Sequence, residues 1–311
     1  MRNILKFFII YTPQSFVVLS IAVKSLLINT PFRFTLVGNG IYDKDLKIIK
    51  SFVDSNERLE FLDLPGNVIV PHGTALMHLL RNHDDAYFCF CDSDIFATKN
   101  ITKELENARA NCEVFSSCKP LEWTVKEDKR GYRGHCVTSP SGLNLAMTYF
   151  SIYKTEPLKA ILNQHKISLE RYMRREQIPK HVAKLISTKD QHNWKFNTAK
   201  LANLMLAMSG MTLRYQEIDG LLHLGGISRF SVHNIEGTRS EIDPNNKIAN
   251  DRLNSRYYFY QLLERLSIDP FNYALPELNL NNKEFQKAIQ RASQSLVKLY
   301  QEMSRINLED I

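Results

Sequence analysis

Two carboxylates separated by a single residue are the strongest chemical signal in this chain. Asp92 and Asp94 follow an unbroken apolar run at residues 87–90, with Ser93 between them. Paired carboxylates are oxygen ligands suited to Mg²⁺ or Mn²⁺, cations that keep part of their water shell and bridge to phosphates. The pair therefore predicts a divalent-metal and diphosphate site. Acid-x-acid triplets also occur as solvated turn residues or helix caps, and the triplet alone leaves that alternative open.

The element that must position these acids is the apolar run before them. It is short and aromatic-rich, which predicts a strand buried on both faces, as in a parallel sheet covered by helices. Open α/β folds bind their ligands beyond the carboxyl ends of such strands. The two aspartates are therefore expected at the rim of a sheet.

Strand and helix patterns alternate over the first hundred residues. Strands are predicted at 5–11, 32–37, 59–64 and 87–90, and helices at 15–27, 44–53 and 74–80. Ser15 is expected to cap the first helix. This order predicts an α/β fold with a mostly parallel central sheet and helices on both faces. The chain has no GxxxxGK[ST] or GxGxxG loop, so a metal would have to hold the phosphates instead.

The character of the chain changes near residue 236. Residues 1–235 are predicted to form the catalytic domain and 236–311 a helical extension, with a polar linker at 238–250 and amphipathic helices at 252–266 and 283–305. In the last helix, Phe285, Ile289, Leu296 and Tyr300 recur at helical spacing. This apolar face predicts packing onto the parent domain or pairing of two subunits as a homodimer. Docking on an anionic membrane face is the alternative.

Composition limits the partners and the compartment. The net charge of +7 and a pI near 9.0 indicate an anionic partner, yet no recognisable nucleic-acid-binding module accompanies the basic residues. The five cysteines are odd in number and lack zinc-type spacing, which favours free thiols in a reducing compartment. Polar residues interrupt the apolar N-terminal stretch, so neither a signal peptide nor a membrane span is predicted. We expect a cytoplasmic protein, with peripheral contact at the inner face of the membrane as an option.

Over residues 5–230 the order of these features resembles the A-type-fold, nucleotide-sugar-dependent glycosyltransferases, and most closely their family 2. The resemblance is carried by the strand ends at 9–12 and 37–40, the segment 72–76, the Asp-x-Asp strand at 87–94 and the histidine-glycine segment 222–228. It implies that Asp94 binds Mn²⁺ or Mg²⁺ directly and that Asp92 faces the ribose or the metal. It implies further that His223 is the distal metal ligand or a donor to the leaving diphosphate. It further implies that the donor nucleotide is bound by Tyr11, Thr12, Asn39, His72, Asp92 and Ser93.

His223 and the glycines after it also have independent physical support. Imidazole is a competent Mn²⁺ ligand, and Gly225 and Gly226 would allow close approach of the backbone to a phosphate. A histidine that is simply hydrogen-bonded within a loop is the alternative.

Two departures from the family pattern leave parts of the chemistry open. Gly38 stands where many relatives carry an acid that pairs with the base, so the identity of the base is open. The usual acidic pair of the catalytic base is not evident. Asp190 is the candidate base that would deprotonate an acceptor hydroxyl, with Glu122, Glu217 and Asp219 as fallbacks. A solvated loop acid is the alternative interpretation of Asp190.

Together these features predict a metal-dependent glycosyltransferase. It would move a sugar from a nucleoside-diphosphate donor, with UDP favoured, to a hydroxyl of a glycan or lipid-linked acceptor in surface polysaccharide synthesis. The glycine-containing basic stretch at 129–135 favours either a loop that closes over the donor or an ordinary surface loop. The alternatives are a metal-dependent nucleotidyl- or phosphotransferase and a non-catalytic binding protein on a degenerate transferase scaffold.

Overall fold

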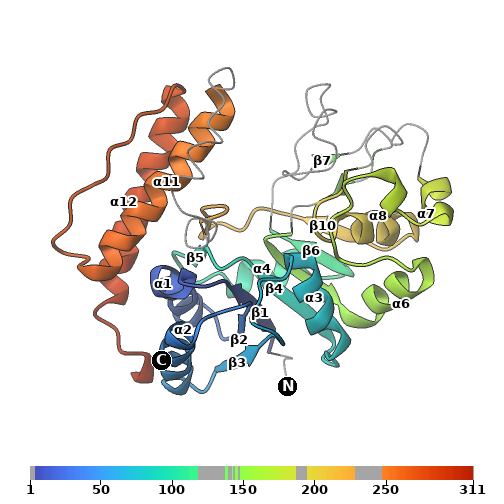
Figure 1. Ribbon diagram of the computed structural model, residues 1–311, viewed down its shortest axis with the longest axis horizontal. Helices are drawn as coiled ribbons and strands as arrows, with labels where there is room; N and C mark the ends of the chain where they lie inside the picture. Colours follow the sequence, from blue (N-terminus) through green and yellow to red (C-terminus); the bar gives the residue numbers. More distant parts are fainter. Residues whose placement is uncertain are drawn as a thin grey trace. The chain divides into compact units, whose positions relative to one another are not determined.

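The computed structural model describes residues 4–117, 137–138, 142, 144–145, 148–186, 195–227 and 247–310 (Figure 1). The predicted alternation over the first hundred residues is confirmed. Its strands and helices are β1 (Lys6–Tyr11), α1 (Ser15–Asn29), β2 (Arg33–Gly38), α2 (Asp43–Asp54), β3 (Leu59–Asp63), α3 (His72–Arg81) and β4 (Tyr87–Cys91).

These strands belong to a seven-stranded sheet with the order β10-β6-β9-β4-β1-β2-β3. The three strands from later in the chain are β6 (Val114–Ser116), β9 (Phe150–Lys154) and β10 (Leu213–Tyr215). The pairs β2–β3 and β6–β10 are parallel, whereas β9 runs antiparallel to both β4 and β6. The predicted fold class, an α/β protein with a mostly parallel central sheet, is therefore confirmed, with one reversed strand inside the sheet.

The remaining strands and α-helices of the described residues up to 227 have eleven residues or fewer. They are β5 (Ile95–Ala97), α4 (Thr102–Ala108), β7 (Val137–Thr138), β8 (Asn144–Leu145), α6 (Thr155–His165), α7 (Lys180–Leu185), α8 (Lys200–Met208) and β11 (Leu221–His223). The alternation of apolar and polar residues at 147–153 contains β9, and α8 ends at Met208. A two-stranded antiparallel ribbon, β5–β11, stands apart from the large sheet.

The capping prediction for α1 is wrong. The N-cap residue is Gln14, whose φ is 61° and whose side chain makes no capping hydrogen bond. The Ser15 hydroxyl instead donates to the Thr12 carbonyl (2.7 Å) and accepts from the Thr12 N–H (3.0 Å). The buried Asp45 of α2 accepts from the Gln14 N–H (2.7 Å). The start of α1 is therefore fixed by a hydrogen bond from a residue distant in sequence and by the contacts of Ser15 with Thr12, and not by a serine cap.

The packing around Gly73 explains why the second residue of α3 is a glycine. A Cβ atom at this position would lie 2.6 Å from the Leu169 carbonyl oxygen and 2.5 Å from Glu170 Cα. Because both are backbone atoms, the neighbouring chain could not move aside cheaply. The glycine therefore permits the segment at 169–170 to pass close to the start of α3.

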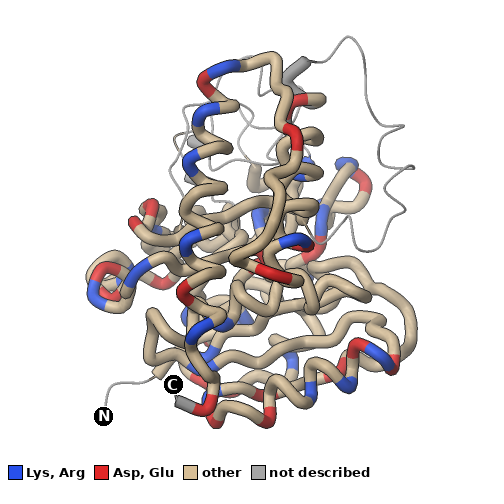
Figure 2. Tube along the Cα trace, turned by 90° about the vertical axis from the view of Figure 1, so that its left-hand side faces the viewer, with Lys and Arg blue, Asp and Glu red and all other residues tan. Residues whose placement is uncertain are grey.

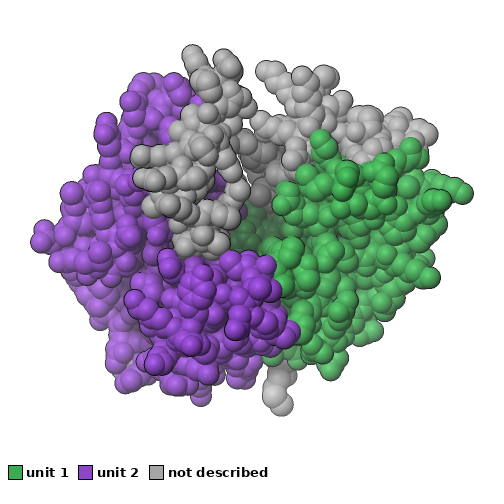
Figure 3. Space-filling model, viewed as in Figure 1, with its two compact units in different colours: residues 1–8, 70–92, 102–219 green, residues 9–69, 93–101, 220–311 purple. Residues whose placement is uncertain are grey.

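The described chain divides into two compact units, coloured in Figure 3. One unit contains residues 1–8, 70–92 and 102–219, and the other contains 9–69, 93–101 and 220–311. The C-terminal helices therefore belong to the same unit as α1 and α2. The predicted domain boundary near residue 235 stays a prediction.

Two long helices end the chain, α11 (Lys247–Ile268) and α12 (Lys283–Met303). They pack against each other, and both contact α1. The Tyr300 hydroxyl donates to the Val18 carbonyl of α1 (2.9 Å). The apolar face of α12 is thus buried within its own chain, as predicted for packing onto the parent domain. The predicted linker at 238–250 is too long, because α11 begins at Lys247.

Among the helices of the described residues, none combines the length and the apolar character that a bilayer crossing requires. Cys89, Cys91 and Cys112 are buried free thiols, as predicted. Cys118 and Cys136 lie outside the described residues.

Candidate metal and nucleotide site

The Asp-x-Asp pair lies where β4 ends, as predicted from the run before it. Residues Phe88 to Cys91 of β4 are buried, and the Asp92 N–H donates to the Tyr149 carbonyl (2.7 Å) just before β9. Asp92 is half-buried, whereas Asp94 is only 2% exposed. The two acids therefore sit in different environments although one residue separates them.

The β5–β11 ribbon brings His223 to Asp94. In its register His223 pairs with Ile95, and the Leu224 N–H donates to the Asp94 carbonyl (3.3 Å). The ribbon is tied to α1, because the Ser25 hydroxyl accepts from the Ala97 N–H (3.0 Å) and Asn29 Nδ2 donates to the Ala97 carbonyl (3.1 Å). Nothing in the local sequence of these three-residue strands predicts that they pair.

The Asp94 carboxylate is held from two sides. His223 Nε2 lies 3.4 Å from one of its oxygens, and the Ile227 N–H donates to the other (3.1 Å). Burial pushes the pKa of Asp94 up, but the His223 ring and the backbone N–H groups of Ile227 and Gly226 together hold that pKa below its ordinary value. Asp94 is therefore a buried carboxylate kept in its charged form.

The glycines after His223 allow close approach of the backbone to Asp94, and the predicted approach to a phosphate stays a prediction. Gly225 and Gly226 have φ values of +77° and +83°, a left-handed region that other residues rarely adopt. This conformation turns the chain so that the Gly226 and Ile227 N–H groups point at Asp94. In this structure the glycines thus allow the backbone to approach a carboxylate of the chain itself.

One carboxylate oxygen each of Asp92 and Asp94 and one ring nitrogen of His223 lie within 4.8 Å of one another. Mn²⁺ binds readily to a set of two carboxylates and an imidazole, whereas Mg²⁺ would bind mainly to the carboxylate oxygens. The residues present therefore fit the predicted cation. The three residues predicted as metal ligands are the ones that the fold brings together.

Three of the residues predicted to bind the nucleotide, Tyr11, Thr12 and Asn39, lie at the ends of β1 and β2. The Asn39 N–H, just after β2, donates to the carbonyl of Tyr11, the last residue of β1 (2.9 Å), and Asn39 is buried. The Tyr11 ring has no exposed surface and meets Phe16 edge-on at 5.1 Å, so this ring is part of the core. The Thr12 hydroxyl is buried without a hydrogen-bond partner among the described residues.

His72 and Ser93 complete the predicted nucleotide set. The half-buried His72 ring stands edge-on to Phe90 of β4, with 6.3 Å between ring centroids. Ser93, between the two aspartates, is buried.

The predicted catalytic base lies outside the described residues, and so do Glu122 and the stretch 129–135. Of the fallback acids, Glu217 is exposed, and its negative charge acts on the Tyr149 phenol, as does that of Asp92. Burial, followed by the negative charges of Glu217 and Asp92, raises the pKa of Tyr149 to about 12. Asp219 is exposed, and its N–H donates to Glu104 (3.1 Å). Sequence reasoning missed Tyr149, because a single tyrosine before a strand carries no chemical pattern.

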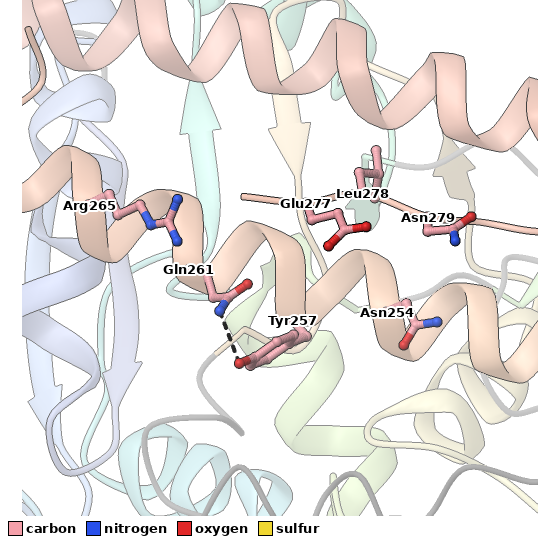
Figure 4. A pocket seen from close by; sticks show the side chains of 7 residues that line it. All are labelled: Asn254, Tyr257, Gln261, Arg265, Glu277, Leu278 and Asn279. Carbon is pink, nitrogen blue, oxygen red and sulfur yellow. Dashed lines mark hydrogen bonds between the residues drawn. The ribbon is translucent and has the colours of Figure 1, made fainter. Parts of the chain in front are cut away.

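A separate cavity of about 470 Å³ lies along α11 (Figure 4). In it the Gln261 side-chain amide donates to the Tyr257 hydroxyl (3.0 Å). Its lining comes from α11 and the segment at 277–279: Asn254, Tyr257, Gln261, Arg265, Glu277, Leu278 and Asn279. None of the predicted site residues lines this cavity.

No protein-family model matches the chain, and no curated protein matches its sequence. Solved structures do resemble it. One is residues 1-349 of TarS from S. aureus in complex with UDP, with 13% identity and a TM-score of 0.40 over 96% of this chain and 90% of that one. Another is the mannosyltransferase PcManGT from Pyrobaculum calidifontis in complex with GDP-Man and Mn²⁺, with 10% identity and a TM-score of 0.36 over 94% of this chain and 69% of that one.

A third is the glycosyltransferase GlyE of Streptococcus pneumoniae, with 12% identity and a TM-score of 0.35 over 69% of this chain and 46% of that one. At TM-scores of 0.40 and below, these similarities carry no argument about this chain. Assignment to family 2 stays a prediction.

Proposed function

We propose that this protein is a metal-dependent glycosyltransferase that moves a sugar from a nucleoside-diphosphate donor, with UDP favoured, to a hydroxyl of a glycan or lipid-linked acceptor. The observation that carries the proposal is the cluster of Asp92, Asp94 and His223 at the end of β4. Carboxyl ends of strands are where open α/β sheets bind their ligands.

In this proposal Asp92, Asp94 and His223 hold Mn²⁺ or Mg²⁺. The cation, when bound, offsets negative charge on the departing diphosphate. The contribution of the chain is preorganisation: the Gly226 and Ile227 N–H groups and His223 hold Asp94 charged and fixed before any ligand arrives. Asp92, which is less buried, is the acid better placed to reach a bound donor as well.

The nucleotide would lie over the ends of β1 and β2. The Thr12 hydroxyl, buried and without a partner among the described residues, supports a ligand contact at this point. For Tyr11 and Asn39 the contact would come from backbone or amide groups, since the Tyr11 ring is enclosed in the core. His72 and Ser93 remain proposed contacts of the donor.

Asp190 is the proposed base that takes the proton of the acceptor hydroxyl. Glu217 is the rival, because its negative charge acts on the same Tyr149 phenol as that of Asp92. The variants Asp190→Asn and Glu217→Gln distinguish these two candidates. The variant that lacks the true base loses turnover but keeps its affinity for the donor, whereas the other variant keeps both turnover and donor affinity. Loss of donor affinity in Asp190→Asn would contradict its assignment as the base.

The first test is binding. Thermal shifts are measured with UDP, GDP, dTDP and ADP, each with and without Mn²⁺, on the wild type and on Asp94→Asn. The matched control is Asp84→Asn, which also removes one carboxylate but at a side chain that is 98% exposed. We expect Mn²⁺-dependent stabilisation by a nucleoside diphosphate in the wild type and the control, and none in Asp94→Asn.

The other outcomes decide against the proposal. If no nucleotide stabilises the protein, or if the thermal shift in Asp94→Asn equals that of the wild type, the proposal is wrong. The protein would then be a binding protein on a transferase-like scaffold. A nucleotidyl- or phosphotransferase would instead release pyrophosphate or transfer phosphate when supplied with a nucleoside triphosphate. Mass analysis of products from a panel of donor sugars then identifies the sugar. The acceptor, a cytoplasmic location and a role in surface polysaccharide synthesis remain parts of the proposal.

A further inference from the structure

A line of cations runs along one side of α12. Lys283, Lys287 and Arg291 are spaced by four residues and Lys298 follows seven later, so helical periodicity places them on one face. Arg305 continues the line just after the helix ends. All five side chains are exposed. Figure 2, which looks onto α11 and α12, shows the blue positions recurring down one helix. We call these five residues the cationic stripe.

The stripe points away from the rest of the chain because the opposite face of α12 is buried. Ile289 and Leu296 are each two residues from a stripe residue, about 200° around the helix, and both are buried. The end of α12 is fixed as well: Lys24 of α1 donates to the Ile306 carbonyl and Asn56 donates to the Leu308 carbonyl. The apolar face of α12 is therefore not available to an outside partner, while the cationic face is.

Exposed apolar side chains of the segment at 271–275 lie beside the C-terminal half of the cationic stripe, and the exposed Ile268 ends α11 three residues before this segment. Ile268, Phe271 and Leu275 are 81%, 53% and 62% exposed. The Arg305 guanidinium lies 5.2 Å from the centroid of the Phe271 ring, and Lys298 and Leu275 line the same groove. Charge and apolar surface are therefore side by side on this part of the molecule.

The backbone that carries these apolar side chains is held in place. The Asp269 carboxylate accepts from the N–H groups of Phe271 and Asn272, and Gln301 of α12 donates to the Pro270 carbonyl (3.0 Å). Arg265 donates to the Ala274 carbonyl (2.6 Å). The exposure of Phe271 and Leu275 is thus built into a segment tied to α11 and α12.

We propose that the cationic stripe, together with Ile268, Phe271 and Leu275, docks on the surface of an anionic phospholipid bilayer. Cations attract the headgroups, and the apolar side chains enter the boundary between headgroups and acyl chains. A nucleic acid or another soluble polyanion would match the charge but would leave Ile268 and Leu275 in water. The inference does not depend on the transferase function, since it concerns binding to lipid alone.

The acidic residues of α12 limit the expected strength of binding to the bilayer. Residues 283–305 contain five cations and two acids, a net charge of +3. Glu284 pairs with Lys287 (3.0 Å) and Glu302 pairs with Lys298 (3.7 Å). We therefore expect reversible association that weakens steeply with salt. Each cation near an anionic surface contributes about fivefold to the partition coefficient, so removing three should lower it roughly 100-fold.

The test is co-sedimentation of the full chain with vesicles of 70% phosphatidylcholine and 30% phosphatidylglycerol, and with vesicles of phosphatidylcholine alone. The charge variant is Lys287→Gln/Arg291→Gln/Lys298→Gln. Its matched control is Lys44→Gln/Lys47→Gln/Lys50→Gln, three exposed lysines of α2 whose loss changes the net charge equally. An apolar variant, Ile268→Ser/Phe271→Ser/Leu275→Ser, tests the other half of the surface, and thermal denaturation checks that every variant folds.

We expect binding to the anionic vesicles only, lost in the charge variant, reduced severalfold in the apolar variant and retained in the α2 control. Equal loss in the control would show that net charge alone is responsible and would overturn the proposal. Binding to neutral vesicles that is unchanged in the charge variant would also overturn it, as would binding of a soluble polyanion but no vesicle. If the charge variant alters the oligomeric state in light scattering instead, the face pairs two copies of the chain and the proposal is wrong.

Discussion

Asp94 and Asp251 are both buried carboxylates, 2% and 3% exposed, yet their partners differ. Asp251 accepts hydrogen bonds from the backbone N–H groups of Asn281 and Asn282 and from the Asn281 amide, each at 2.8 Å. These neutral donors tie α11 to the start of α12. Asp94 also has backbone donors, but its other oxygen faces His223, a group that can itself bind a cation.

The comparison teaches that burial and a shifted pKa do not identify a functional acid. For both aspartates burial raises the pKa, yet both pKa values are held low: by the His223 ring and hydrogen bonds at Asp94, and by hydrogen bonds from Asn281 and Asn282 at Asp251. What differs is the partner. A carboxylate satisfied by backbone amides stabilises the fold, and a carboxylate that shares its space with a second ligand residue can hold a metal.

The largest expected effect is that of Asp94→Asn on turnover. Losing the charge at this position should lower kcat by about 10³-fold, in the range known for removal of a preorganised electrostatic group. The melting temperature should change by only a few degrees, because the amide can still accept from the Ile227 N–H. Turnover is measured by release of the nucleoside diphosphate. A wild-type rate in Asp94→Asn would show that Asp94, like Asp251, is not needed for activity.

Asp251→Ala should act on stability alone. It removes the acceptor for three donors at the junction of α11 and α12 and should lower the free energy of unfolding by about 1–2 kcal/mol. Urea denaturation measures the loss. Turnover of the folded variant should equal that of the wild type, and a loss of activity comparable to that of Asp94→Asn would show that Asp251 is part of the site.

The dependence of stability on pH sharpens the same contrast. Because the folded pKa of Asp251 is lowered, its contribution is fully present above the unfolded value near 3.9 and is lost as pH falls through the folded value. Between wild type and Asp251→Asn, the difference in unfolding free energy should therefore be constant from pH 6 to 8 and shrink below about pH 4. Urea titrations at fixed pH values test this, and a difference that grows on acidification would have the wrong sign.

The smallest effect is expected at the surface. The pair of Lys287 and Glu284 is exposed on both sides, so a double-mutant cycle with Lys287→Gln and Glu284→Gln should give a coupling of at most about 0.5 kcal/mol. Thermal denaturation of the four proteins measures it. A coupling above 1 kcal/mol would mean that exposed charges on α12 contribute to the fold as the buried acids do.

Much of the first hundred residues follows from local pattern. The run before Asp92 is apolar at every position because β4 is buried in the sheet, and the bounds of β1 to β4 agree with the predicted ones within about two residues. The reversal of β9 was not predictable. Apolar alternation at 147–153 indicates a strand but says nothing of its direction, which depends on pairing with β4 and β6.

The sequence by itself determined the strand–helix alternation and the position of two acids at a strand end, because each depends on residues only a few positions apart. The tertiary structure decided which residues meet. Ile227 and Asp94 are 133 positions apart, and they meet because β5 pairs with β11 while α1 holds β5. In strands of three residues the identity of the side chains cannot specify a distant partner; closure of the rest of the fold does.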